Sequence, residues 1–157
     1  AGALFVNGTP IDLHSKVIGA KSNNNFEAEL HALNAETKTA MYVRNFFNSI
    51  IAGLVSKPVS LQEDNQAVIK FSGRQQVSPR TRHLGAKENY VRDVLENKLA
   101  ELSYVNTDDN TSDIGTKALP KAKFEAFRRA LGIIPLSEVV ANMTPADAAM
   151  MRAKLGV

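Results

Sequence analysis

Three acidic residues lie where a carboxylate could bind a ligand. Glu29 falls in the first turns of a long predicted helix, between Phe26 and Leu33, so it lies on the apolar stripe that faces a sheet. Asp64 follows a predicted strand, at the carboxyl end where open α/β sheets usually bind ligands. Asp113 begins a short predicted helix, whose positive end favours an anion. These positions make the three acids the candidate functional residues.

Each acid also has a purely structural explanation. Glu29, together with Glu27, could simply favour the helix N-terminus electrostatically, and Asp64 and Asp113 could be ordinary helix caps. Glu36 falls on the same stripe as Glu29, so facing the sheet does not by itself single out Glu29. For any one acid taken alone, the pattern favours the structural explanation.

A set of basic residues flanks the predicted helix after Asp64 and the start of the next helix. These residues could contact phosphates, which binds nucleic acid without reading its sequence. A solvated polar loop explains them equally well. No aromatic residues alternate with them, so recognition of single strands is not supported. The set comprises Lys70, Arg74, Arg80, Arg82, His83 and Lys87.

The first half of the chain carries clear signals for the elements that position these residues. Residues 3–20 are predicted to be β structure, with a hairpin turn at Asn7-Gly8 and a third short strand at 17–20. An apolar stripe at helical spacing predicts one long helix over 26–54. A strand at 59–62 and a short helix from Gln66 to Phe71 then surround Asp64.

The second half alternates in the same way. A long helix is predicted with Leu84, Val91, Leu95, Leu99 and Leu102 on one side, followed by a strand at 102–105 and a short helix at 112–118. Pro120 is expected in the first turn of a helix that turns Phe124, Phe127 and Leu131 inward. Thr144-Pro145 begins a closing helix over 145–155. Helices between strands indicate an α/β protein with both parallel and antiparallel strand pairs.

Composition sets outer limits on function. The 157 residues contain no cysteine, which excludes disulfides and thiolate metal sites, and the net charge of +3 permits nucleic-acid binding without requiring it. No apolar run approaches the ~18 residues that a membrane span needs, and the first residues lack the pattern of a signal peptide. We therefore expect an intracellular protein without membrane insertion, its compartment left open, organelles included.

Five segments, in the same order, resemble the RNase H-like domain at the end of copia-type retrotransposon polyproteins. Residues 10–16 resemble Pro-Ile-Ser-Trp-Lys-Ser-Lys of that family, and residues 23–30 resemble Ser-Ser-Thr-Glu-Ala-Glu-Tyr with one residue of slack. Residues 64–67 are similar to Asp-Asn-Gln-Ser-Ala, and residues 80–84 to Arg-Thr-Lys-His-Ile. Residues 112–120 resemble Ala-Asp-Ile-x-Thr-Lys-Pro-Leu-Pro. The resemblance covers residues 2–132. We take residues 1–132 as the domain, incomplete at its N-terminus, and residues 133–157 as a C-terminal extension with an extra helix.

The resemblance implies an RNase H-like mixed sheet flanked by helices and a nuclease that cuts the RNA strand of an RNA–DNA hybrid with two Mg²⁺ ions. On the matched positions, Glu29, Asp64 and Asp113 would be three of four metal ligands. The fourth is an aspartate on the family's first strand, which is absent from the given chain; Asp12 belongs to the following hairpin and does not replace it. That strand is central to the sheet, so we expect a protein partner or an upstream segment to supply it.

Departures from the family pattern favour loss of activity. Glu63 replaces a small or apolar residue, Gly85 replaces an acid, and Glu88-Asn89 replaces a Tyr-His pair. The leading hypothesis is a domesticated, retrotransposon-derived pseudoenzyme that acts as a nucleic-acid-binding or structural subunit of a larger assembly such as a ribonucleoprotein. The alternative is an active Mg²⁺-dependent ribonuclease H within a longer reverse-transcriptase polyprotein; Mg²⁺ is expected only in that case. A third hypothesis is a protein-interaction module that binds no nucleic acid.

Overall fold

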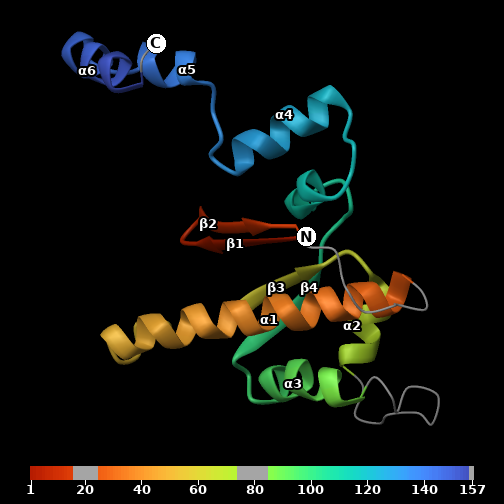
Figure 1. Ribbon diagram of the computed structural model, residues 1–157. Coiled ribbons are helices and arrows are strands. Elements are labelled where there is room, and N and C mark those ends of the chain that lie inside the picture. The colour runs from red at the N-terminus through yellow and green to blue at the C-terminus, as the bar shows by residue number, and fades with distance from the viewer. Residues whose placement is uncertain (16–24, 74–84, 156–157) are drawn as a thin grey trace.

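The computed structural model describes residues 1–15, 25–73 and 85–155 (Figure 1). Within these residues it is a mixed α/β structure with two separate two-stranded sheets, six α-helices and one 3₁₀ helix. The elements are β1 Gly2–Val6, β2 Thr9–His14, α1 Asn25–Ile50, β3 Val59–Glu63, α2 Gln66–Ser72, α3 Gly85–Glu96, β4 Ala100–Tyr104, η1 Thr111–Gly115, α4 Lys121–Ala130, α5 Leu136–Ala141 and α6 Pro145–Leu155.

β1 and β2 form the predicted antiparallel hairpin. Asn7 and Gly8 both adopt positive φ, 50° and 77°, as a two-residue primed turn requires, and Val6 pairs with Thr9 on either side of it. The predicted third strand at 17–20 lies outside the described residues. The turn chemistry of Asn7-Gly8 was therefore a sufficient signal for this element.

The second sheet is the parallel pair of β3 and β4. Leu61 lies opposite Leu102, and the Val59 amide donates to the carbonyl of Leu99 at 2.9 Å. Parallel strands need a crossover connection, and the segment that contains α2 and α3 provides it. The expected parallel and antiparallel pairs are both present, but the strands in the described part of the chain do not form the expected single sheet, and the structure does not confirm an RNase H fold.

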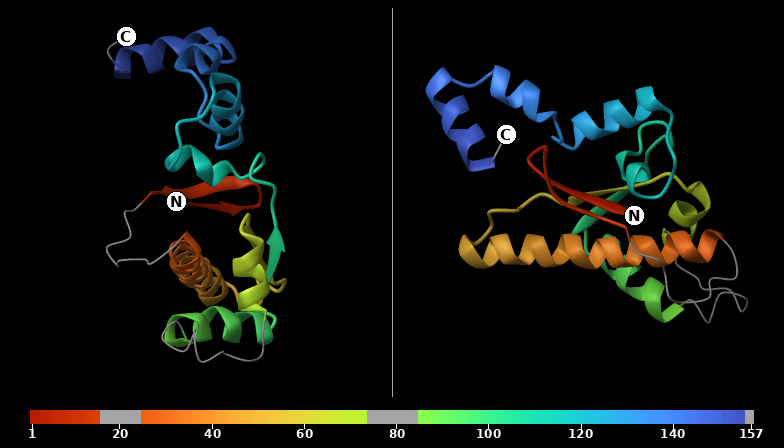
Figure 2. Two further views of the ribbon diagram at one scale, coloured as in Figure 1. Left: turned by 90° about the vertical axis from the view of Figure 1, so that its right-hand side faces the viewer. Right: turned by 45° about the horizontal axis from the view of Figure 1, so that its top comes forward.

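The core lies where α1 meets β3, β4, α2 and α3 (Figure 2). Leu30 and Leu33 of α1 pack with Val68 of α2 and Val91 of α3, both of which are completely buried. Two turns further along α1, a second cluster joins the helix to the parallel strands and α3; its members are Ala40, Met41, Leu61, Val94 and Ala100. Apolar residues at helical spacing thus form the buried face of α1, as the sequence predicted.

Two predicted helices extended too far. α1 ends at Ile50 rather than at residue 54, Gly53 adopts φ 76°, and Leu54 is 52% exposed. α3 ends at Glu96, because Lys98 adopts φ 55° and the Leu99 amide bonds back to the Val94 carbonyl, a left-handed helix termination usually made by glycine. Leu99 and Leu102 therefore leave the helix, and Leu102 lies in β4.

The C-terminal helices follow local end signals. α4 ends at Ala130, and Gly132 just beyond it has φ 68°. The Thr144 hydroxyl caps α6 by accepting from the Asp147 amide at 3.2 Å, and the predicted closing helix is confirmed. Phe127 and Leu131 are buried as predicted, but Phe124 is 43% exposed. Figure 1 shows α5 and α6 beyond α4, away from α1. In the described part of the chain, no helix has both the length and the apolar character needed to cross a membrane.

Candidate acidic site beside the β1–β3 cavity

A cavity of about 830 Å³ separates the two sheets. We call it the β1–β3 cavity, because residues 1–7 of the hairpin line one side and residues 59–64 of the parallel pair line the other. α1 contributes Glu29, Leu33 and further residues to its wall, and residues 110–112 at the start of η1 complete it. The cavity thus lies where an additional element would be needed to join the sheets.

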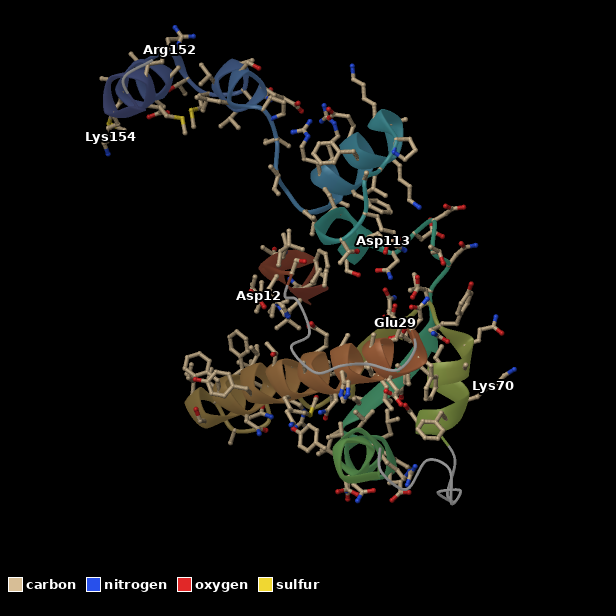
Figure 3. The ribbon with its side chains drawn as sticks, turned by 45° about the vertical axis from the view of Figure 1, so that its right-hand side comes forward. Asp12, Glu29, Lys70, Asp113, Arg152 and Lys154 are labelled. Carbon is tan, nitrogen blue, oxygen red and sulfur yellow. The ribbon has the colours of Figure 1, made fainter. Side chains whose placement is uncertain are left out.

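The structure brings the three candidate acids to this region from three separate elements. Glu29 on α1 and Asp64 after β3 line the cavity, and Asp113 is buried in the neighbouring η1 (Figure 3). Burial raises the pKa of Glu29, and the negative charges of Asp64 and Asp113 raise it further. Asp64 and Asp113 therefore lie within electrostatic reach of Glu29 and make its ionisation more costly.

Lys117 supplies positive charge to this acidic group. Its Nζ lies 2.8 Å from Oδ1 of Asp113. The hydrogen bond to Asp113, with further attraction from Asp64 and Glu29, raises the pKa of Lys117. The other carboxylate oxygen of Asp113, Oδ2, is buried without a hydrogen-bond partner. The ammonium of Lys117 therefore balances part of the charge that a bound cation would otherwise meet.

Asp64 and Asp113 are not helix caps, so the structural explanation offered for them is wrong. Asn65 caps α2, where its side chain accepts from the Ala67 and Val68 amides, and Asn110 caps η1. Asp64 instead accepts a hydrogen bond from the Thr107 hydroxyl at 3.2 Å, which links the end of β3 to the loop after β4. The predicted helix at 112–118 is the shorter 3₁₀ helix η1. Asp64 thus makes a tertiary contact, whereas the ion pair of Asp113 with Lys117 is local.

Glu63 is a buried acid next to Asp64 at the end of β3. It is only 8% exposed, and its Oε1 accepts from the Asn65 amide at 3.0 Å. Burial raises the pKa of Glu63 to about 7, and the charges of Glu29 and Asp64 act in the same direction, while the Asn65 hydrogen bond opposes them. A protonated Glu63 limits the charge repulsion at the end of β3.

The described residues do not by themselves make a Mg²⁺ site. No group of three His, Asp or Glu side chains among them lies close enough together to share one ion. Asp64 and Asp113 lie close enough to Glu29 to raise its pKa, but Lys117 already contacts Asp113. Mg²⁺ chemistry at this position would require further oxygen ligands.

The predicted basic surface is described only in part. Lys70 is exposed in the last turn of α2 (Figure 3). Lys87 belongs to α3, but its side chain lies outside the description, and Arg74, Arg80, Arg82 and His83 lie outside the described residues. Phosphate binding by this set therefore stays a prediction.

Sequence reasoning missed a second polar constellation, which ties the hairpin to α1. The His14 ring lies between two carboxylates, with Nδ1 2.8 Å from Oδ2 of Asp12 and Nε2 2.8 Å from Oε1 of Glu36. Burial raises the pKa of Glu36, whereas its contact with His14 lowers it. The Glu36 carboxylate also fills the space where a side chain at Gly2 would begin. Asp12 and His14 at alternate strand positions were the available signal; their helix partner was not evident.

Comparisons with known proteins place the chain near retrotransposon polyproteins. It is 26% identical over 133 residues to the retrovirus-related Pol polyprotein from transposon TNT 1-94 of Nicotiana tabacum. It is 28% identical over 123 residues to the transposon Ty1-DR1 Gag-Pol polyprotein of Saccharomyces cerevisiae. These matches cover 84% and 72% of this chain but only 10% and 7% of the polyproteins. No family model and no solved structure matches the chain. The chain is therefore distantly similar to copia-type retrotransposon polyproteins over most of its length.

Proposed function

We propose that this chain is an RNase H-like domain derived from a copia-type retrotransposon and that it binds RNA–DNA hybrid without cutting it by itself. The observation that carries the proposal is the acidic group beside the β1–β3 cavity. Glu29, Asp64 and Asp113, which the resemblance assigns as metal ligands, lie near that cavity on three separate elements, while Lys117 contacts Asp113 and the described acids form no three-ligand group. This arrangement supports an RNase H-like origin together with weakened metal binding.

The relatives and the net charge of this chain support nucleic acid as its ligand class. The similar proteins are transposon Pol and Gag-Pol polyproteins, and this chain carries a net charge of +3. Lys70 and the other predicted cations would meet backbone phosphates, which contributes affinity without sequence preference. Such binding supports a structural or carrier role inside a larger assembly.

The alternative function is an active Mg²⁺-dependent ribonuclease H within a longer polyprotein. The convergence of Glu29, Asp64 and Asp113 favours this alternative. It requires at least one more carboxylate at the acidic end of the cavity, carried by a segment that the chain does not contain. A protein with either function would bind RNA–DNA hybrid, but only the alternative function predicts cleavage of the RNA.

One experiment separates the two functions. A fluorescently labelled RNA–DNA hybrid is incubated with the chain in Mg²⁺, and anisotropy and product length are measured together. We expect salt-sensitive binding and intact RNA, unchanged in Asp64→Asn and in the matched control Asp109→Asn, an exposed aspartate on the loop after β4. RNA cleavage that Asp64→Asn abolishes and Asp109→Asn preserves would establish the nuclease instead.

Substitutions at two separate lysines test the proposed binding surface. Replacing Lys70 with Gln should weaken binding and reduce the slope of log affinity against log salt by about 0.9, the value of one lost phosphate contact. Lys154→Gln on α6 is the control, since Lys154 is exposed and lies far from Lys70 (Figure 3). Equal effects of the two substitutions, or binding that does not depend on salt, would contradict the proposed surface and favour a protein-interaction module.

A further inference from the structure

The C-terminal half of α1 carries an exposed apolar stripe. Tyr42, Phe46 and Ile50 are spaced four residues apart, so they lie along one side of the helix. Their side chains are 73%, 52% and 60% exposed, respectively. Figures 1 and 2 show that this end of α1 extends beyond α3. We call these three residues the α1 stripe.

The α1 stripe is separate from the core and from the β1–β3 cavity. Leu33 and Met41 are among the buried residues of α1, and Val43 and Phe47 line the cavity. None of the three stripe residues belongs to either group. An occupant of the cavity would therefore contact a different side of α1 and would leave the stripe exposed.

The α1 stripe lacks the charges that a solvated helix face usually carries. Between Lys38 and Lys57 the only charged residue is Arg44, and Arg44 lines the cavity instead. The exposed residues beside the stripe, Asn45 and Ser49, are neutral. Because an uncharged face does not repel an identical face, a second copy of this chain is a partner that the stripe can accept.

Local contacts hold the end of α1 in shape. The Phe46 ring packs edge-on against the Phe47 ring, with the ring centroids 5.8 Å apart. The Asn48 side chain accepts a hydrogen bond from the Val55 amide at 2.8 Å and donates one to the Val55 carbonyl at 3.3 Å, which anchors the segment that follows the helix. A surface that is already ordered loses little conformational entropy when a partner binds.

The area of the α1 stripe is sufficient for a reversible dimer. Side chains of this size have roughly 200 Å² of surface each, so the three together expose roughly 400 Å². Pairing two stripes removes roughly 800 Å² of apolar surface from water, and the neutral residues beside them bring the contact to about 1,000–1,200 Å². This is the lower end of the range for specific complexes, so we expect a Kd in the micromolar range.

We propose that two copies of this chain associate through the α1 stripe about a twofold axis. Phe46 is the middle residue of the stripe, so it lies at the axis opposite its own counterpart, and Tyr42 packs against Ile50 of the second copy. The two helices are antiparallel in this arrangement, which keeps the remainder of each copy on opposite sides of the contact. The proposal goes beyond hybrid binding and does not depend on it.

Sedimentation velocity of the intact chain at about 100 μM tests the association, because a complex with a micromolar Kd is mostly formed at that concentration. The parent chain should have twice the mass of a monomer. Phe46→Glu should remain monomeric, since two like charges would meet at the axis. Phe124→Glu on α4 is the matched control, because Phe124 is also a helical phenylalanine and is 43% exposed. This control should dimerise like the parent, and both variants should retain the circular dichroism of the parent.

Mixing two charge variants tests whether the stripe meets itself. Phe46→Glu and Phe46→Lys should each be monomeric alone, whereas an equimolar mixture should restore the dimer because opposite charges then meet at the axis. A higher salt concentration should not weaken the parent dimer, whose contact is apolar, although it weakens binding to nucleic acid.

Three results would overturn the proposal. A parent chain that stays monomeric at about 100 μM would show that the α1 stripe does not bind a second copy and leave it to a different partner. A dimer that persists in Phe46→Glu would place the interface on another surface. A mixture of the two charge variants that stays monomeric would exclude the contact between the two Phe46 positions.

Discussion

Replacing Glu63 with Gln is expected to stabilise the protein at neutral and alkaline pH. Glu63 is 8% exposed at the end of β3, and its Oε1 accepts from the Asn65 amide. Gln retains this acceptor and its size while removing the charge that burial, Glu29 and Asp64 make unfavourable. The substitution therefore isolates the cost of an ionised carboxyl at this position.

The size and sign of the effect follow from the pKa. In the folded protein the pKa of Glu63 is about 7, whereas its ordinary value is 4.5. Between these values the folded state holds a proton that the unfolded chain has released, so stability falls as pH rises from 4.5 to about 7. Above that range the ionised carboxyl costs the folded state roughly 3 kcal/mol. Glu63→Gln should recover most of this at pH 8 and nothing at pH 4.

Urea denaturation followed by circular dichroism at pH 4, 6 and 8 measures the effect. The control is Glu101→Gln, an exposed acid on the neighbouring strand β4, which should change stability by less than about 0.5 kcal/mol at each pH. A stabilisation by Glu63→Gln that is equal at pH 4 and pH 8 would refute the reasoning, because a pH-independent gain cannot come from ionisation. A loss of stability at pH 8 would show that Glu63 is ionised and usefully paired there.

Three further predictions concern the core and the hairpin. Leu30→Ala should destabilise the fold by about 2–5 kcal/mol in the same urea assay, because Leu30 is 2% exposed, whereas Leu136→Ala, at a residue that is 40% exposed, should change it by less than 1 kcal/mol; equal losses would contradict the described core. His14→Gln should lower the free energy of unfolding by no more than about 1 kcal/mol, because the contacts of His14 with Asp12 and Glu36 are partly exposed. In a double-mutant cycle with Glu36→Gln, the combined loss should be smaller than the sum of the two single losses; strict additivity would show that the two side chains do not interact. Gly2→Ala should lower stability by no more than about 1 kcal/mol, because the added methyl group displaces the flexible end of the Glu36 side chain from His14. In the Glu36→Ala background, Gly2→Ala should cause no further loss, and a loss of the same size there would contradict this contact.

The sequence by itself determined the elements whose signals are local. Asn7-Gly8 specified the hairpin because few residue pairs tolerate two consecutive positive φ angles. The apolar spacing of Leu30, Leu33 and Ala40 predicted the buried face of α1, and Thr144 with Pro145 predicted the start of α6. In each case the residues that determine the element are neighbours along the chain or within a few helical turns.

Helix ends were less predictable where the terminating residue was unusual. Lys98 adopts the left-handed conformation that ends α3, a position where glycine is the common signal, so the leucine pattern continued past the true end. Leu102 belongs to both the helical pattern and the following strand, and only its pairing with Leu61 decides between them. A side-chain pattern alone does not contain that pairing.

The tertiary structure alone decided how the sheets divide and which charges meet. The Asn7-Gly8 turn indicates locally that β1 pairs with β2, but nothing local indicates that β3 pairs with β4 or that a cavity separates the two pairs. Asp64 and Asp113 looked like caps until Asn65 and Asn110 proved to occupy those positions. The physical reason is common to all of these features: strand partners, buried cavities and charge clusters depend on residues that are distant in sequence, and their energies arise only when the chain brings them together.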